Sequence, residues 1–340
     1  MNTRSFLGFA GPSAAAMALL ILLPLLGAAW LSVHESYVKT ELKEVRTTVP
    51  LFGGLTREDV RTIPQPVRDE AGNPVLVWHF VGAGNYANLV DLDRLRKAFA
   101  GDGLEQIYRD VVSIEFWGAL EFSLLYILAT TPGVLLLGFA IALAVDATSK
   151  RVRGALIFAS LLPFIITPVV GALSIYWLFL DNAVVNAVLQ ALGFGKFYFL
   201  SGALPIRALI VLYGIWHVTP FAFVVLYAGL QTLPQDAMEA AIVDGATTWQ
   251  RLRYVVVPHL APLFAFVTLI HVMDAYRVFE PVLVFGSNLY ANSLQYMTYH
   301  ILNSEDNYTK AAAASLLTVA GIVILLIPML RRFAREGRAA

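Results

Sequence analysis

Four ionisable residues stand three positions apart within an otherwise apolar stretch of the chain: His271, Asp274, Arg277 and Glu280. A charge at the middle of a bilayer costs about 2.5–3.5 kcal/mol on insertion scales, so such residues usually face a protein interior or a water-filled cavity. Arg277 can pair with either acid, because each lies three positions away on a helix. The set could relay ions, hydrogen-bond the hydroxyls of a sugar, or only neutralise itself and lock helices together.

The spacing limits these choices. On a continuous helix each residue advances by about 100°, so steps of three drift and the four side chains would not share one narrow stripe. As charged groups within an apolar stretch, Asp274, Arg277 and Glu280 are candidates for a solute path. Mutual neutralisation stays an equal alternative for Arg277 and Glu280. A lone membrane histidine is more often a packing group, which is our interpretation of His271.

Aromatic residues near the ends of two other apolar stretches are further candidates for the solute path: Tyr176, Trp177 and Trp216. A flat ring can stack on the apolar face of a sugar while polar groups bind its hydroxyls. Tyr213 and His217 share the second stretch. Tyrosine and tryptophan also anchor spans at the membrane surface, and anchoring is the commoner role for any single one of them.

A polar segment that follows the fourth apolar stretch predicts a short helix. Pro234 suits the first helical turn, where a missing N–H costs nothing. Asp236 and Glu239 complement the positive end of the helix dipole. Gly245 suits the left-handed residue that closes a helix.

A second short helix is predicted directly after it. Thr247 and Gln250 have the spacing of a capping box, which opens a helix. Pro258 is expected to end that helix, because proline breaks the backbone hydrogen-bond ladder. Two short helices that brace each other would form a rigid knob, able to pass a push from a partner into the membrane helices.

The sequence contains none of the common motifs that would indicate catalysis or metal binding. The chain has no cysteine, which excludes thiolate chemistry and Cys-ligated metals. It also lacks the patterns G-x-x-x-x-G-K-[ST], H-E-x-x-H and G-x-S-x-G. We therefore expect no catalytic residue, no metal and no cofactor bound by this chain.

Composition places the chain in the membrane class. Of its 340 residues, 58% are hydrophobic and 14% are charged, whereas soluble domains carry about 25% charged residues. Lysine plus arginine equals aspartate plus glutamate, which argues against a nucleic-acid partner. Stretches of roughly 20 apolar residues can cross the bilayer. Six are predicted, at residues 9–33, 116–145, 155–180, 206–230, 262–285 and 311–330.

Loop charges predict the orientation, because lysine and arginine are retained on the cytoplasmic side. The loop after the second span holds Lys150, Arg151 and Arg153, and the tail after the sixth begins with Arg331 and Arg332. Residues 286–307 contain neither lysine nor arginine. Both termini are therefore expected in the cytoplasm of a multi-pass bacterial inner-membrane protein. The predicted parts are 1–33, an external segment 34–115 and a membrane core 116–340 whose cytoplasmic loop is 231–262.

Two features of the N-terminal third stay open. The first apolar stretch could be a cleaved signal peptide ending near Gly27, although its length and Pro24 favour a retained span. In the external segment, residues 68–74 are typical of a turn and residues 75–80 of a short strand.

The polar segment resembles the EAA loop of binding-protein-dependent ABC permeases, in which E-A-A, two residues, D-G-A and a later proline follow in order. Weaker matches, at Phe80 to Tyr86 and from Arg153 to Pro168, are similar to the carbohydrate-uptake branch of that family. Residues 285–289 depart from the T-G-G-G-P turn that the family often has near its substrate path. The residues that match the loop are Glu239, Ala240, Ala241, Asp244, Gly245, Ala246 and Pro258.

The resemblance implies a fold of six membrane helices and a role as the membrane subunit of an ATP-driven sugar importer. It implies that the loop is a coupling helix that docks on a separate dimeric ATPase, which uses ATP and Mg²⁺. Further implied partners are a second homologous permease subunit, a periplasmic solute-binding protein and membrane lipid. The alternatives are a secondary transporter that uses Asp274, Arg277 and Glu280 as an ion relay, and a membrane enzyme with interfacial carboxylates.

Overall fold

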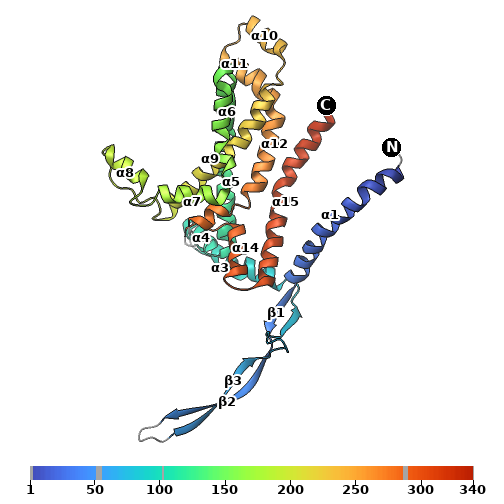
Figure 1. Ribbon diagram of the computed structural model, residues 1–340, viewed down its shortest axis with the longest axis vertical. Coiled ribbons are helices and arrows are strands. Elements are labelled where there is room, and N and C mark those ends of the chain that lie inside the picture. Colours follow the sequence, from blue (N-terminus) through green and yellow to red (C-terminus); the bar gives the residue numbers. More distant parts are fainter. Residues whose placement is uncertain (1–2, 51–55, 102, 286–289, 340) are drawn as a thin grey trace. The chain divides into compact units, whose positions relative to one another are not determined.

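The computed structural model describes residues 3–50, 56–101, 103–285 and 290–339, and most of these residues are helical. Five helices are long and apolar enough to cross a membrane, and a bent pair makes a sixth if it counts as one span. These helices confirm the predicted fold class, a helical membrane protein (Figure 1). Residues 286–289, where the sequence departs from the T-G-G-G-P turn, lie outside the described part. The chain divides into two compact units, residues 1–89 with 301–316 and residues 90–300 with 317–340.

The first unit contains one long helix and two antiparallel two-stranded ribbons, in which β1 pairs with β4 and β2 pairs with β3. The predicted turn and strand are both present: the Asp69 carboxylate accepts hydrogen bonds from the backbone N–H groups of Ala71 and Asn73, and β4 follows. The segment that was predicted to be external therefore adds strands to the helical spans. The elements are α1 (Thr3–Ser32), β1 (His34–Val38), β2 (Thr40–Pro50), β3 (Thr56–Pro66), β4 (Leu76–Phe80) and α2 (Gly84–Val90).

The second unit is a helical bundle in which α5, α9 and α12 pack against one another, while α10 and α11 lie beyond the ends of α6, α9 and α12 (Figure 1). Its elements are α3 (Leu92–Phe99), α4 (Leu104–Val112), α5 (Glu115–Asp146), α6 (Lys150–Ile165), α7 (Pro168–Leu178), α8 (Val184–Ala191), α9 (Ala203–Leu230), α10 (Gln235–Val243), α11 (Thr248–Arg251), the π-helix η1 (Leu252–Val256), α12 (Val257–Ala275) and α13 (Glu280–Val284). The last two helices of the chain are α14 (Leu294–Asn303) and α15 (Tyr308–Ala339).

The contact between α5 and α9 depends on a small residue. A Cβ atom added at Gly138 would lie 2.7 Å from the Cβ of Ala222 and 3.0 Å from the backbone nitrogen of Phe223. Small residues let membrane helices approach this closely. Backbone atoms cannot move aside as a flexible side chain can, so a larger residue at this position must push the two helices apart.

We expect Gly138→Ala to destabilise the bundle by about 1–3 kcal/mol, the usual cost of overpacking a filled core. Unfolding of the purified protein in detergent measures this change. Gly154→Ala is the matched control, because a Cβ at that helical position meets nothing within 4 Å. Equal stability of the two variants would show that the α5–α9 contact is loose.

The predicted third span, residues 155–180, is not one straight helix. It consists of α6 and α7, which meet at an angle of 93°. Ile166 and Thr167 between them have extended backbones, and Pro168 begins α7. Proline disfavours the helical conformation of the residue before it and offers no N–H to continue the ladder, which explains the break.

The predicted fifth span, residues 262–285, is also interrupted. Helix α12 ends at Ala275 and α13 begins at Glu280, with Pro281 in its first turn. Asp274 therefore lies in the last turn of α12, Arg277 in the connection and Glu280 at the start of α13. The assumption of a continuous helix through these residues is wrong, and this changes which side chains can meet.

An ion pair ties together the ends of α4, α5 and α9 away from α10. The guanidinium of Arg207 lies 3.2 Å from the Glu121 carboxylate, and both side chains are mostly buried. The Tyr108 hydroxyl donates a hydrogen bond to the same carboxylate at 3.0 Å. Partial burial, together with this hydrogen bond, raises the pKa of Tyr108 above its usual value, so the phenol stays a donor at neutral pH.

Candidate functional site

Helix α10 is a short helix with a well-formed end. Pro234 is its N-cap with an extended backbone, one position earlier than predicted, and Asp236 lies in the first turn. At the other end Gly245 has φ = +74°. The N–H of Gly245 donates to the carbonyl of Ile242, and the N–H of Ala246 donates to that of Ala241. These two bonds form a Schellman motif, which satisfies the last carbonyls of the helix.

The second predicted helix opens as expected and ends differently. The Gln250 side chain accepts from the Thr247 backbone N–H at 2.7 Å, and the Thr247 hydroxyl oxygen accepts from the Gln250 N–H. This capping box is confirmed. The helix does not end before Pro258. It passes through the π-helix η1 into α12 without leaving the helical region, and Pro258 occupies the first turn of α12. The wider π turn shifts the preceding carbonyls, so the proline ring can be accommodated without a break.

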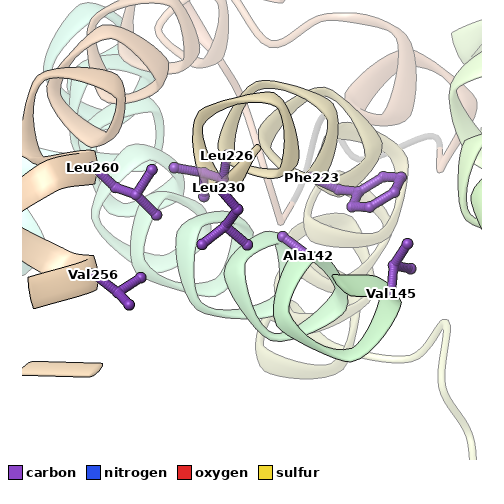
Figure 2. Close-up of a cluster of buried hydrophobic side chains, with 7 residues drawn as sticks. All are labelled: Ala142, Val145, Phe223, Leu226, Leu230, Val256 and Leu260. Atoms are coloured by element: carbon purple, nitrogen blue, oxygen red, sulfur yellow. The ribbon is translucent and has the colours of Figure 1, made fainter. Parts of the chain in front are cut away.

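A buried apolar cluster lies between the loop formed by α10 and α11, called the α10 loop, and the long helices of the bundle. Met238 of α10 and Leu252 of η1 pack against the cluster as partly buried residues. Figure 2 shows that its members come from α5, α9, η1 and α12. A push on α10 is therefore received by three long helices at once. The buried members are Ala142, Val145, Phe223, Leu226, Leu230, Val256 and Leu260.

Hydrogen bonds fix the two ends of the loop to the bundle. The Gln231 side chain donates to the Asp146 carboxylate at the end of α5 at 2.8 Å. The Thr232 hydroxyl lies 3.2 Å from Nε2 of His259 in α12. Arg153 donates to the carbonyl of Asp146, which satisfies an orphan group at the end of α5. The loop is thus held on both sides as well as from below.

The outward face of the loop is apolar as well as charged. Glu239 and Ala240 are exposed, and Ala241 and Ala246 are half-buried. Val243 is 85% exposed and Trp249 is 67% exposed, next to exposed Ile242. Exposed apolar patches of this kind mark contact surfaces. Ile242, Val243 and Trp249 were not singled out from the sequence, although three apolar residues in a polar loop were a visible signal.

A cavity of about 320 Å³ lies deeper in the bundle, between α5, α9, α12 and α13. His271, Asp274, Arg277 and Glu280 all line it. The interruption after Ala275 explains how residues at this spacing face one space. The full lining is Tyr126, Pro168, Tyr213, Gly214, His217, Val218, His271, Asp274, Ala275, Arg277, Val278, Phe279, Glu280, Pro281 and Gln295.

The charges of the cavity are two carboxylates and one guanidinium. Arg277 lies 3.9 Å from the Asp274 carboxylate, and the two side chains are 52% and 72% exposed. Both groups therefore keep polar atoms free to meet a solute. Glu280 adds a second acid to the same wall.

The two ring nitrogens of His271 differ in their surroundings: Nε2 lies within hydrogen-bond distance of the Thr130 hydroxyl, and Nδ1 does not meet a partner among the described residues. The Thr130 hydroxyl donates to the carbonyl of Tyr126 at 2.7 Å, and Nε2 of His271 lies 3.0 Å from the same hydroxyl oxygen. Because that hydroxyl has only one hydrogen, we assign the N–H to Nε2, as the donor to Thr130. Nδ1 is then an acceptor, and it has no partner among the described residues.

The aromatic candidates lie elsewhere. The described residues that line the cavity do not include Tyr176, Trp177 or Trp216. Tyr176 packs edge-on against Phe285, and Trp177 is 61% exposed on α7. Tyr126, Tyr213 and His217 supply the cavity's rings instead. Tyr126 was not singled out, although a phenol within an apolar span is an indication of a polar interior.

Comparisons with known proteins agree on one family. A family model described as "Binding-protein-dependent transport system inner membrane component" matches residues 122–334. The trehalose/maltose transport system permease protein MalF of Thermococcus litoralis is 28% identical over 242 residues, which cover 69% of this chain and 81% of that protein.

Solved structures show the same fold. One is the crystal structure of a bacterial ABC transporter that imports the acidic polysaccharide alginate, with a TM-score of 0.59, 22% identity, and coverage of 72% of this chain and 88% of the other. A second is the bacterial alginate transporter in complex with a periplasmic protein bound to alginate pentasaccharide, with a TM-score of 0.57, 24% identity, and coverage of 70% and 85%.

Proposed function

Because the chain belongs to the family of binding-protein-dependent transport system inner membrane components, we propose that its α10 loop couples a solute path to a separate ATPase. The observation that carries this proposal is the construction of the loop. Its tip is closed rigidly at Gly245, exposes apolar residues such as Val243, and rests on a cluster shared by the bundle. Glu239 adds one carboxylate for a charged contact, and Pro258 leads back into the span.

We infer that ATP hydrolysis by partner subunits supplies the energy for transport. Its sequence has no P-loop, so ATP and Mg²⁺ would be bound and used by the partner subunits. The chain itself would act without catalysis. A compact, exposed helix is the kind of element that can enter a cleft of such a partner and transmit its movement to α5, α9 and α12.

A second, homologous permease subunit would complete the path. Helices α7 and α8 expose apolar side chains, among them Val170, Trp177 and Val188, and Leu192 directly after α8 is exposed as well. These residues lie on the same side of the 93° bend as Pro168, which lines the cavity. A soluble receptor would deliver solute to the opposite surface from the ATPase. We expect cytoplasmic termini, because Lys150, Arg151 and Arg331 lie in short segments next to predicted spans, and basic residues in such segments are retained on the cytoplasmic side.

The chemistry of the cavity favours a neutral carbohydrate. Asp274 and Glu280 outnumber Arg277, so an anionic solute would meet like charge. Sugar hydroxyls can donate to the two carboxylates, and the tyrosine rings offer flat apolar faces. The relative from Thermococcus litoralis is named for trehalose and maltose, which are neutral disaccharides.

We expect Asp274→Ala to lower uptake of a neutral disaccharide about tenfold or more at sub-saturating concentration. Hydrogen bonds to charged groups contribute about 1.5–3 kcal/mol, and about 1.4 kcal/mol corresponds to a factor of ten. Uptake of radiolabelled trehalose and maltose by proteoliposomes containing the whole complex measures the change.

Leu136→Ala is the control for this experiment, since its side chain on α5 is 70% exposed and is absent from the described lining of the cavity. A selective loss in Asp274→Ala supports the assignment. Unchanged uptake in Asp274→Ala, or preferential uptake of an anionic sugar by the unmodified protein, would contradict it.

A further inference from the structure

The β1–β4 ribbon of the first unit has one apolar face and one polar face. Its register places His34 opposite Phe80, Ser36 opposite Trp78 and Val38 opposite Leu76. Side chains alternate along a strand, so these three pairs share one face. The opposite face carries Glu35, His79, Tyr37 and Val77.

The apolar face is exposed within its unit. Phe80 is 73% exposed, Leu76 is 48% exposed and Trp78 is 40% exposed. A two-stranded ribbon in water is marginally stable by itself, because it has no layer to cover such a face. Contiguous exposed apolar side chains with a polar rim mark a surface that contacts either a partner or a membrane.

The ribbon is fixed to the end of the first membrane helix without a flexible link. The Trp30 ring in the last turn of α1 stacks on His34, with ring centroids 4.2 Å apart, and lies 5.2 Å from Trp78. The Asn85 side chain donates to the carbonyls of both Ser32 and His34. Asn85 belongs to the Phe80 to Tyr86 stretch that resembles the family, and here it satisfies the last carbonyl of α1 and the first carbonyl of β1.

The length of the helix fixes the depth of this junction. The apolar span Ala10–Ser32 has 23 residues, or about 35 Å at 1.5 Å per residue. The hydrocarbon layer is about 30 Å thick, so Trp30 reaches the level of the lipid headgroups. None of the apolar window of this span is buried within the chain. The apolar face of the ribbon therefore continues an uncovered apolar surface of α1 at the depth where aromatic rings prefer to lie.

We propose that the apolar face of the β1–β4 ribbon rests on the membrane surface at the C-terminal end of α1, with phospholipid headgroups and upper acyl chains as its partner. The rings of Trp30, Trp78 and Phe80 lie in the interfacial layer. Glu35 and His79 on the other face point to water. The ribbon thus holds α1 at a set depth and orients the external strands that follow it.

The chain has no native cysteine, so one introduced thiol can be labelled alone. Leu76→Cys and Tyr37→Cys sit on opposite faces of the ribbon, and the native side chains are almost equally exposed, at 48% and 50%. Each variant, assembled in the full complex in phosphatidylethanolamine–phosphatidylglycerol vesicles, is spin-labelled. Collision rates are then measured with oxygen, which is lipid-soluble, and with a nickel chelate, which is water-soluble.

We expect the oxygen-to-nickel collision ratio to be several-fold higher at Leu76→Cys than at Tyr37→Cys. Equal ratios, or a higher ratio at Tyr37→Cys, would overturn the proposal. Low collision rates with both reagents at Leu76→Cys would also overturn it, because they indicate a protein cover, and spin–spin broadening would identify that cover as a second copy. Protection from nickel that requires the solute receptor would assign the face to that receptor instead. Val38→Cys, on the same face, repeats the test if Leu76→Cys does not assemble.

Discussion

Replacement of Gly245 by valine is expected to abolish ATP-driven uptake while leaving the chain inserted in the membrane. At φ = +74° a side chain clashes with the adjacent backbone, at a cost of about 1–2 kcal/mol, and a β-branched residue is a genuine outlier there. Relief of that strain breaks the two bonds that close α10. A change of one to two kcal/mol shifts a conformational equilibrium by a factor of about 5–30. Transport and membrane abundance should be measured on the same vesicles.

A matched series separates backbone conformation from side-chain volume. A Cβ at Gly245 meets nothing within 4 Å, so volume alone predicts no effect there. Gly245→Asn should retain more uptake than Gly245→Val, because asparagine adopts the left-handed conformation more readily. Gly154→Ala, at an ordinary helical position in α6 where an added Cβ meets nothing within 4 Å, should behave as the unmodified protein. Full transport by Gly245→Val would contradict the coupling role of the loop.

Deletion of Arg253 from the π-helix η1 is expected to have an effect of similar size. A π turn holds one residue more than an α turn. Removal of that residue rotates the part of the chain before the turn by about 100° relative to the part after it. Val256 and Leu260 are anchored in the buried cluster. The α10 loop must therefore rotate instead of α12, and the exposed face of the loop would no longer point at the ATPase. We expect uptake to be lost.

Arg253→Ala removes the same side chain and keeps the chain length. Arg253 is exposed, and its guanidinium lies 5.7 Å from the ring of Tyr254, a contact worth about 0.5–1 kcal/mol at an exposed site. Near-normal uptake by this variant, beside loss in the deletion, would establish that helical phase matters. Equal activity of both variants would show that the loop tolerates rotation.

The α10 loop could be predicted from the sequence because its signals are local. A proline, a closing glycine and a capping box each act within four residues of themselves. The glycine and the capping box are found where they were expected, and Pro234 lies one position earlier, at the N-cap. The exception is Pro258. Its effect depends on the π turn before it, and that turn is set by packing of Val256 and Leu260 against distant residues of α5 and α9.

The cavity could be predicted only in part, because it depends on where helices break. Spacing indicated that His271, Asp274, Arg277 and Glu280 would diverge around one helix. The interruption between Ala275 and Glu280 instead brings all four to one space. The contributions of Tyr126 and Tyr213 come from other helices, and a single sequence does not indicate which helices become neighbours. The amphipathic ribbon was missed for the same reason, since the pairing of β1 with β4 spans a long excursion of the chain.

The central claim is that a separate nucleotide-driven motor acts through the loop between α9 and α12. The most direct test is solute uptake by proteoliposomes that contain the permease pair and receptor, with and without the ATPase subunits. We expect uptake only when the ATPase and ATP are both present, and no uptake when an ion gradient is supplied in their place. Uptake driven by an ion gradient in the absence of the ATPase would contradict the account and favour an ion relay through Asp274 and Arg277.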